Sequence, residues 1–475
     1  MNTPIYNKLL DLKSENRIPF HMPGHKRKDS GNFFGIEAMD ITEIRGYDNL
    51  HCPEGMIRES MDLLRKIYGT RESWYLVGGS TMGILISVSS VCKPGDKILI
   101  GRNCHKAVYN CIRLLQLEAV YCYPEVSGQF DVYKDMKPES IEEILKEHPD
   151  VKAVVITSPT YEGVVSDVTG IKKVLERYDI PLIVDEAHGG HLIFHEYFPK
   201  SAVECGADLV IQSTHKTLPS FTQTAVLHLC SELVSKERIE EMIDIYETSS
   251  PSYLLLASAE YGIMYMNEKE DKVNQYVDKL KKFRRRCGQF NHLLLIDANE
   301  MNCFDYDRGK LVISVKNTNI SGKQLFDCLL NDYKIELEME NLTYGIAMTS
   351  VCDAEKDYDR LWEALYEIDR EMEKSERTVK KNQIVYPKKI MESWECSQYP
   401  SYKVDLEQAE GKICGKYVMI YPPGSPILVP GEKIIKEVVE NIRYYLYNGY
   451  NVTGISGDQI TVIDHEVTDR RGHVK

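Results

Sequence analysis

The sequence predicts an α/β fold whose largest part is a three-layer domain, with a parallel sheet between two layers of helices. From residue 58 to residue 265, short apolar runs alternate with stretches of helical periodicity. This alternation is typical of parallel strands joined by crossover helices. A different pattern of short strands and helices follows and indicates smaller units.

Each element of the large domain has its own signal. An amphipathic stretch from Ile57 to Tyr68 predicts a helix that ends at Gly69. Ser140–Glu147 and Ile171–Tyr178 also have helical patterns. The apolar runs predict strands at Ser73–Val77, Lys97–Ile100, Ala119–Tyr123, Val151–Thr157, Leu182–Asp185, Leu209–Gln212 and Ala225–Leu229.

The rest of the chain predicts an N-terminal arm and two smaller α+β units. Residues 1–20 have the pattern of a short helix, and helical sequence near 252–286 leads into the first small unit. We expect four parts: an arm and linker at 1–57, the large domain at 58–265, a small α+β domain at 266–381 and a C-terminal α+β domain at 382–475. The expected elements of the smaller units are strands Leu311–Val315, Ile335–Met339 and Ile346–Thr349 and helices Ser321–Leu330, Asp357–Met372 and Glu432–Tyr447.

Composition limits the class of protein. The 475-residue chain has 58 Lys and Arg against 72 Asp and Glu, a formal charge of −14, which argues against nucleic acid as the main partner. It lacks an apolar run of about 18 residues and an apolar signal core at its N-terminus, so we expect a cytoplasmic protein with no membrane partner. Its 13 cysteines, an odd number without a Cys-x-x-Cys pair, predict reduced thiols.

Two apolar runs of strand length end in reactive polar residues. One is followed by Ser-Thr-His and Lys216, and the other by Asp185. Ligands of open α/β sheets bind at the carboxyl ends of strands, so we expect this amine and this carboxylate to meet at one edge. The pair suits pyridoxal 5'-phosphate (PLP), which needs an imine-forming amine and an anion beside its pyridine nitrogen. Taken singly, the lysine could be a solvated surface residue and the carboxylate a helix cap.

Two further segments add candidates. Gly78-Gly-Ser-Thr-Met-Gly83 follows a predicted strand and opens a helix. Backbone N–H groups at a helix start, with the hydroxyls of Ser80 and Thr81, predict a phosphate site, although such turns are also common connectors. His105 also follows a strand. It is a candidate to stack on a cofactor ring, and the alternative is a surface or helix-capping histidine.

A cluster of histidines offers a metal site as an alternative. His188, His191 and His195, with His21 and His25 as additions, include His-x-x-His spacing that zinc can use. No glutamate completes a His-Glu-x-x-His arrangement, and Gly189-Gly190 suits a close backbone approach better than a ligand helix. We therefore expect no metal.

Together these residues resemble the ornithine/lysine/arginine decarboxylase family, a PLP-dependent group of the aspartate-aminotransferase fold, in a short form without an N-terminal wing domain. The resemblance runs over nearly the whole chain. It is carried by His21-Met-Pro-Gly-His-Lys26, Leu50-His-Cys-Pro-Glu-Gly55, Gly79-Ser-Thr81, Asn103-Cys-His-Lys106, Val184-Asp-Glu-Ala-His-Gly189, Gln212-Ser-Thr-His-Lys-Thr217, Ser249-Ser-Pro-Ser-Tyr253 and Tyr421-Pro-Pro-Gly-Ser-Pro-Ile-Leu-Val-Pro-Gly-Glu432.

The resemblance implies decarboxylation of a basic amino acid to its amine and CO2 for polyamine synthesis, with arginine favoured over lysine and ornithine. It makes residues 58–265 the PLP-binding domain and residues 382–475 the C-terminal decarboxylase domain. It implies a homodimer or higher oligomer with a shared active site. By motif, Lys216 is the Schiff-base lysine, Asp185 pairs with the pyridinium, and His105 and Ala187 contact the two faces of the ring. The phosphate is surrounded by Ser80, Thr81, Ser213 and His215, and Thr248 reaches the phosphate of the neighbouring subunit. Lys216 or His215 returns the proton to the α-carbon.

The residues leave other functions open. Ile84 stands where relatives often carry Asn, and Tyr386-Pro-Lys-Lys-Ile390 departs from the family pattern, so the substrate is not fixed. A PLP aminotransferase, lyase or racemase is one alternative, and a non-catalytic PLP-fold binding protein is another. For the substrate's distal cation we expect Glu432, at the end of a proline-rich wall, with Glu162 as the second candidate.

Overall fold

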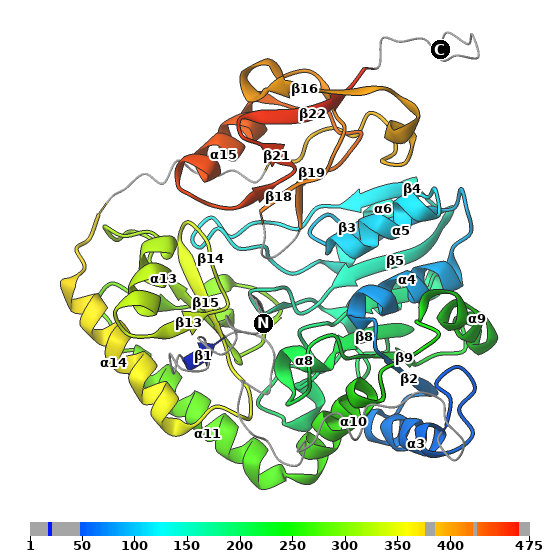
Figure 1. Ribbon diagram of the computed structural model, residues 1–475, viewed down its shortest axis with the longest axis horizontal. Helices are drawn as coiled ribbons and strands as arrows, with labels where there is room; N and C mark the ends of the chain where they lie inside the picture. Colours follow the sequence, from blue (N-terminus) through cyan, green and yellow to red (C-terminus); the bar gives the residue numbers. More distant parts are fainter. Residues whose placement is uncertain (1–17, 21–47, 376–384, 421–424, 465–475) are drawn as a thin grey trace, which may run out of the picture.

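The computed structural model describes residues 18–20, 48–375, 385–420 and 425–464 (Figure 1). The predicted helical arm and the His21–His25 motif lie mostly outside these residues. Where the arm is described, the helix prediction is wrong: Ile18–Phe20 forms strand β1, which pairs in parallel with β13 (Ile335–Leu337).

A seven-stranded sheet forms the centre of the large domain, in the order β2-β9-β8-β7-β5-β3-β4. Its strands are β2 (Glu72–Leu76), β3 (Lys97–Gly101), β4 (Glu118–Cys122), β5 (Val151–Thr157), β7 (Leu182–Asp185), β8 (Leu209–Ser213) and β9 (Ala225–Leu229). Every predicted strand is present within one residue. The prediction of a wholly parallel sheet is wrong at β9, which runs antiparallel to both β8 and β2.

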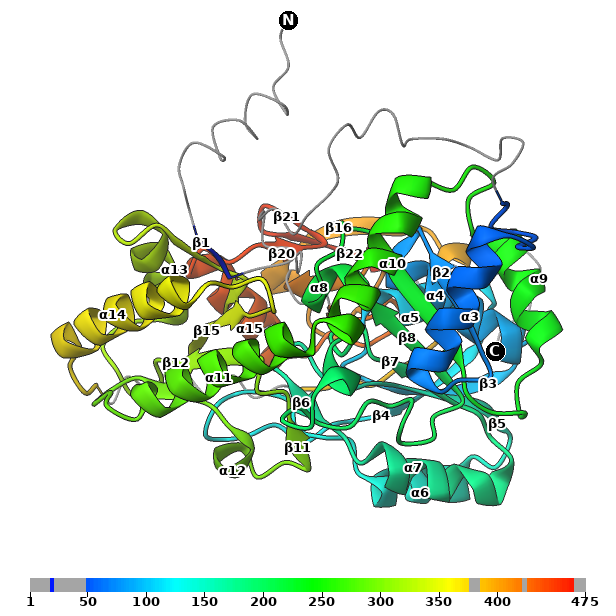
Figure 2. The ribbon, with the colours of Figure 1, turned by 90° about the horizontal axis from the view of Figure 1, so that it is seen from below.

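Helices cover both faces of this sheet, which confirms the three layers. Alternate residues along a strand point to opposite faces: Ile183 packs among the residues of one core, while Leu182 and Val184 pack in another. The first face carries α3 (Met56–Tyr68), α4 (Gly79–Val91), α5 (Lys106–Leu114), α9 (Lys236–Tyr246) and α10 (Tyr253–Glu268), and the second carries α6 (Pro138–Glu147) and α7 (Val168–Leu175). Figure 2 shows α6 and α7 on the side of the sheet away from α4 and α10.

The helix signals in the sequence have clear structural causes. Helix α3 buries the apolar side of its amphipathic pattern and ends where Gly69 adopts φ 67°, a left-handed conformation that suits glycine. Helix α7 begins three residues earlier than predicted, and the last turn of the predicted helix is a 3-10 helix over Glu176–Tyr178.

The small unit is an antiparallel sheet with helices packed against it. Its strands follow the order β10 (Leu294–Leu295), β12 (Lys310–Ser314), β15 (Tyr344–Met348) and β14 (Met339–Glu340). The predicted strand over 335–339 is divided between β13 and β14. The helices are α11 (Glu270–Cys287), α12 (Ala298–Met301), α13 (Gly322–Asn331), which Ser321 caps as predicted, and α14 (Glu355–Glu371).

The C-terminal unit has its own apolar core, drawn from residues 406–462. Two small antiparallel sheets, β16-β22-β17 and β19-β18-β20, pack with one helix. The strands are β16 (Ser401–Asp405), β17 (Ile413–Cys414), β18 (Val418–Ile420), β19 (Pro426–Leu428), β20 (Val452–Thr453), β22 (Gln459–Ile463) and β21 (Ile455–Ser456), which pairs with β22. Helix α15 (Lys436–Tyr447) begins later than predicted, so Glu432 lies in a loop. The unit sits against the β3 and β4 edge of the large sheet (Figure 1).

Candidate active site

The carboxyl ends of neighbouring parallel strands bring the predicted residues together. Asp185 is the last residue of β7, and Lys216 lies in the short helix α8 (Thr214–Thr217) directly after β8. Strands β7 and β8 pair in parallel, with Asp185 beside Ile211. The amine and the carboxylate therefore reach the same edge of the sheet, as the sequence predicts.

A cavity of about 630 Å³ lies at this edge. Seven of the predicted site residues line it: Ser80, Thr81, His105, Asp185, Ala187, His215 and Lys216. Ser213 lies just behind the wall, where its hydroxyl is 2.7 Å from the Ser80 hydroxyl. Thr248 and Glu432 do not line the cavity.

One end of the cavity is formed by the start of helix α4. Gly79 has φ +73°, which allows the chain to turn from β2 into the helix. The first N–H groups of a helix have no partner within it, and they carry the positive end of its dipole. His215 is fixed nearby, with Nδ1 donating to the carbonyl oxygen of Thr224 at 2.9 Å. This end of the cavity suits an anion.

Asp185 and Lys216 lie together in a buried part of the site. Burial raises the pKa of Asp185, and the Lys216 cation partly opposes that rise. Burial lowers the pKa of Lys216, against the pull of Asp185. A lysine whose pKa is lowered offers more of the neutral amine, the form that reacts with an aldehyde.

His105 both caps a helix and faces the cavity, so its position fits both of the roles, helix cap and stacking residue, that the sequence left open. Its ring caps helix α5, with Nδ1 accepting from the backbone N–H of Ala107 at 3.3 Å, and it also lines the cavity. Burial lowers the pKa of His105 to about 4. The ring is therefore uncharged at neutral pH and suited to stack on an aromatic ligand.

The three histidines of the metal alternative point to different partners. His188 lies between two lysine amines, Nε2 of His191 lies 3.1 Å from a carboxylate oxygen of Asp307, and Nδ1 of His195 accepts from the N–H of Tyr197. The described residues contain no group of three or more metal-ligating side chains. His21 and His25 lie outside those residues.

The role predicted for Glu432 is contradicted by the structure. Its side chain is fully buried, and its two oxygens accept hydrogen bonds from the guanidinium of Arg102, at 3.0 Å for the closer contact of Nη2. Arg102 also donates to the carbonyl oxygen of Pro426 at 2.7 Å. The carboxylate thus neutralises a cation of this chain and fastens the C-terminal unit to the end of β3.

Glu432→Gln is expected to destabilise the fold rather than to weaken substrate binding. Removing one partner of a buried ion pair leaves the other charge uncompensated, which costs about 3–5 kcal/mol. Urea unfolding of the two proteins would measure this loss. Glu355→Gln, which breaks an exposed pair with Lys282, is the control and should unfold like the wild type. An unchanged stability together with a higher KM would restore the original assignment.

Two other carboxylates face the cavity. Glu162, the second candidate of the sequence, is buried and accepts a hydrogen bond of 2.9 Å from the hydroxyl of Tyr344; burial raises its pKa. Glu338 lies between β13 and β14 and accepts from the hydroxyl of Tyr161. Sequence reasoning missed Glu338, because it belongs to the small unit and follows no strand-end motif.

Comparison with known proteins identifies the family. Residues 3–328 match the Orn/Lys/Arg decarboxylase major domain, and residues 372–451 match the C-terminal domain of the same family.

The chain belongs to the Orn/Lys/Arg decarboxylase family.

An arginine decarboxylase of Bacillus subtilis is 33% identical over 95% of each chain, and one of Bacillus anthracis is 32% identical over 95% of this chain and 94% of its own. The constitutive lysine decarboxylase of E. coli has the same fold, with a TM-score of 0.77 and 20% identity over 97% of this chain and 82% of its own.

As a member of this family, the protein is an amino acid decarboxylase with an aspartate-aminotransferase type of large domain. Ile84, at the position where the sequence departs from the family pattern, lines the cavity. No helix of the described residues has both the length and the apolarity needed to cross a bilayer.

Proposed function

We propose that the cavity binds PLP and that the protein decarboxylates a basic amino acid, with arginine as its substrate. The observation that carries the proposal is the convergence of Lys216, Asp185, His105 and the start of helix α4 on one cavity. The arginine decarboxylases of two Bacillus species support the choice of substrate, because they align with nearly the whole chain.

The residues present fit this cofactor. The start of helix α4, with Ser80 and Thr81, would hold the phosphate; Asp185 would face the pyridine nitrogen; Lys216 would bind the aldehyde carbon. Asn103 supports the fit, since it lines the cavity and its buried Oδ1 has no hydrogen-bond partner among the described residues. When bound, PLP supplies an electron sink for the bond that breaks at the α-carbon.

The chain's own residues would orient the reaction and move a proton. Asp185 would place a carboxylate where a positive charge must be held, and low exposure would strengthen that attraction. His105 and Ala187 would confine the ring between them. Lys216 or His215 would return a proton to the α-carbon after CO2 leaves. The product amine would enter polyamine synthesis.

For the substrate's distal cation we propose Glu338, with Glu162 beside it, in place of Glu432. Both carboxylates line the cavity, and Tyr161 and Tyr344 fix their positions by hydrogen bonds. A cation that leaves water needs such an anionic partner.

Glu338→Gln is expected to lower kcat/KM by about 10- to 100-fold, mainly through KM, since a charge-assisted hydrogen bond contributes about 1.5–3 kcal/mol. Steady-state kinetics with the true substrate would measure it. Glu340→Gln is the matched control, because this residue is two positions away and does not line the cavity. Equal kcat/KM in Glu338→Gln and wild type would remove Glu338 from the substrate site.

We also propose a homodimer with a shared site. Thr248 does not line the cavity of its own chain. It lies in a loop, where its carbonyl oxygen accepts a hydrogen bond from Nε2 of His51 at 2.8 Å. That position is consistent with a role at a neighbour's phosphate. Sedimentation of the active protein would test it, and a fully active monomer would contradict the shared site.

Incubation with arginine, lysine and ornithine, followed by identification of the amine and CO2, tests the proposed reaction. Release of agmatine and CO2 from arginine is expected. Exchange of the α-proton or transfer of the amino group without CO2 would instead favour an aminotransferase or racemase. Binding of PLP without any turnover would favour a non-catalytic protein.

A further inference from the structure

The imidazole of His188 lies between two lysine amines. Its Nε2 is 3.1 Å from Nζ of Lys216, and its Nδ1 is 2.7 Å from Nζ of Lys310. His188 is 5% exposed and Lys310 is 1% exposed. His188 and Lys216 line the cavity, whereas Lys310 is not among its lining residues. Lys310, His188 and Lys216 thus form a continuous series of contacts that leads from the protein interior to the amine of Lys216.

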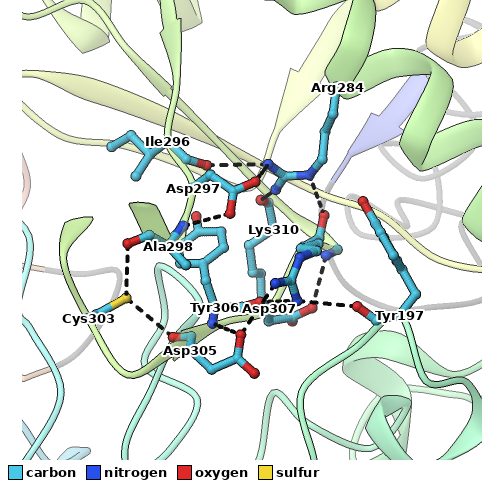
Figure 3. Close-up of polar contacts among 12 residues, drawn as sticks. Tyr197, Arg284, Ile296, Asp297, Ala298, Cys303, Asp305, Tyr306, Asp307 and Lys310 are labelled. Atoms are coloured by element: carbon cyan, nitrogen blue, oxygen red, sulfur yellow. Dashed lines mark hydrogen bonds and ion pairs between the residues drawn. The ribbon is translucent and has the colours of Figure 1, made fainter. Parts of the chain in front are cut away.

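His188 and Lys310 come from different units of the protein. His188 follows β7 of the large domain, and the edge of its ring packs against Tyr161, with centroids 4.7 Å apart. Lys310 opens β12 of the small unit, where its carbonyl oxygen accepts from Nη2 of Arg284 at 2.9 Å (Figure 3). Arg284 in turn pairs with Asp297 at 3.2 Å. The contacts of each residue within its own unit therefore fix how His188 and Lys310 are aligned.

The hydrogen-bonding capacity of imidazole decides how protons are distributed here. A neutral imidazole has one N–H donor and one acceptor nitrogen. Burial and the nearby charges of Lys216 and Lys310, with smaller effects of His215 and His105, hold the pKa of His188 well below its usual range. A neutral His188 can accept from only one ammonium group. One lysine must therefore donate to the ring, while the other accepts as a neutral amine.

Carboxylates lie near both lysines. Burial raises the pKa of Glu162, and Lys310 is among the groups that oppose the rise. For Asp307, burial also acts to raise the pKa, but His191 and Lys310 outweigh it and lower the pKa. Two carboxylates thus favour a cation on Lys310. Lys216 faces Asp185 and the more distant Glu338, and burial still lowers its pKa.

We propose that Lys310 and His188 form a proton relay that charges and discharges the amine of Lys216. Lys310 passes a proton from Nζ to Nδ1 of His188, while the proton on Nε2 of His188 moves to Nζ of Lys216. The reverse transfer returns Lys216 to the neutral amine. Each direction moves one proton and leaves the total charge unchanged. The proposal rests on the role of Lys216 in the proposed function, and Lys310 acts on it only through His188.

Two substitutions of Lys310 separate its charge from its proton. Arginine keeps a cation beside Nδ1 but does not release its proton in proteins. Lys310→Arg in the full-length protein should therefore take up PLP with the pH midpoint of the wild type, while kcat falls by roughly 100-fold or more, as expected when general acid–base transfer is lost. Lys310→Met should lose kcat and also shift the uptake midpoint to higher pH, because the proton then rests on Lys216.

PLP uptake is measured at each pH by the visible absorbance of added PLP. The pH midpoint obtained in this way does not depend on turnover. His188→Gln keeps hydrogen-bonding groups but cannot exchange ring protons, and it should lose kcat like Lys310→Arg. In the double variant His188→Gln/Lys310→Met, the loss should not exceed that of the worse single variant, since residues of one relay act as a unit. Lys316→Met is the matched control, because Lys316 lies in the same unit and pairs with Asp131 outside the cavity.

Wild-type kcat in Lys310→Arg would overturn the relay and leave Lys310 a purely electrostatic group. Losses that multiply in the double variant would also overturn it. Thermal unfolding of each variant separates these outcomes from a collapsed fold, and the Gln and Arg variants give independent tests. If the wild-type protein itself neither takes up PLP nor releases an amine, the proposed function fails instead.

Discussion

Lys216→Ala is expected to abolish decarboxylation, by roughly 1000-fold or more, and to remove the borohydride-reducible link between PLP and the chain. Lys216 is the only lysine among the described residues that line the cavity, and Lys310 lies behind His188. The variant therefore has no substitute amine within reach. Amine release and mass mapping of borohydride-reduced peptides would measure the two effects.

Lys97→Ala is the control for this experiment. Lys97 opens β3 at the opposite end of the sheet and pairs with Asp150, so its loss should leave both turnover and the reducible link intact. Reduction that places PLP on a peptide other than the one carrying Lys216 would show that the wrong amine has been assigned.

Asp185→Asn is expected to lower kcat by about 100- to 1000-fold, the scale for removing one preorganised electrostatic group from an active site. Asparagine fills nearly the same space but carries no charge to hold a pyridinium. The backbone N–H of Ala187, which donates to Asp185 at 3.2 Å, can still bond to the amide oxygen. The fold and much of the PLP affinity should survive, so kcat and bound PLP would be measured together.

Asp208→Asn provides a matched comparison. Asp208 is as buried as Asp185, but it precedes β8 at the far end of the sheet and pairs with Lys172 at 2.6 Å. Its substitution should reduce stability and leave kcat per bound PLP unchanged. If the two variants behaved alike, the role of Asp185 would be structural.

Much of the large domain could be predicted because its signals are local. The strand Leu209–Ser213, for example, is buried from end to end, and reactive polar residues follow where it stops. The direction of β9 was missed, although its short connection to β8 favours it. Parallel neighbours need a crossover of about a dozen or more residues, usually with a helix, and only the four-residue helix α8 lies between these strands.

The errors in the candidate site have a common physical reason. The proline-rich segment correctly suggested that Glu432 is held rigidly, but its partner Arg102 is 330 positions away. No local pattern reveals such a pairing. Glu338 and Lys310 reach the site because the small unit packs over the edge of the large sheet, and strand-end motifs find only residues of the large sheet itself.

The clamp between Arg102 and Glu432 has a consequence for the order in which the site is made during synthesis. Arg102 immediately precedes Asn103 and lies three positions before His105. Ser425 of the C-terminal unit donates to the Asn103 carbonyl oxygen at 2.8 Å and lines the cavity. At roughly 5–20 residues per second, a ribosome needs about 15–65 s to pass from one clamp residue to the other. During this interval the synthesis of the other residues that line the cavity is completed, and Ser425 follows them. The part of the cavity wall that Ser425 supplies is therefore made only after the large domain has been synthesised.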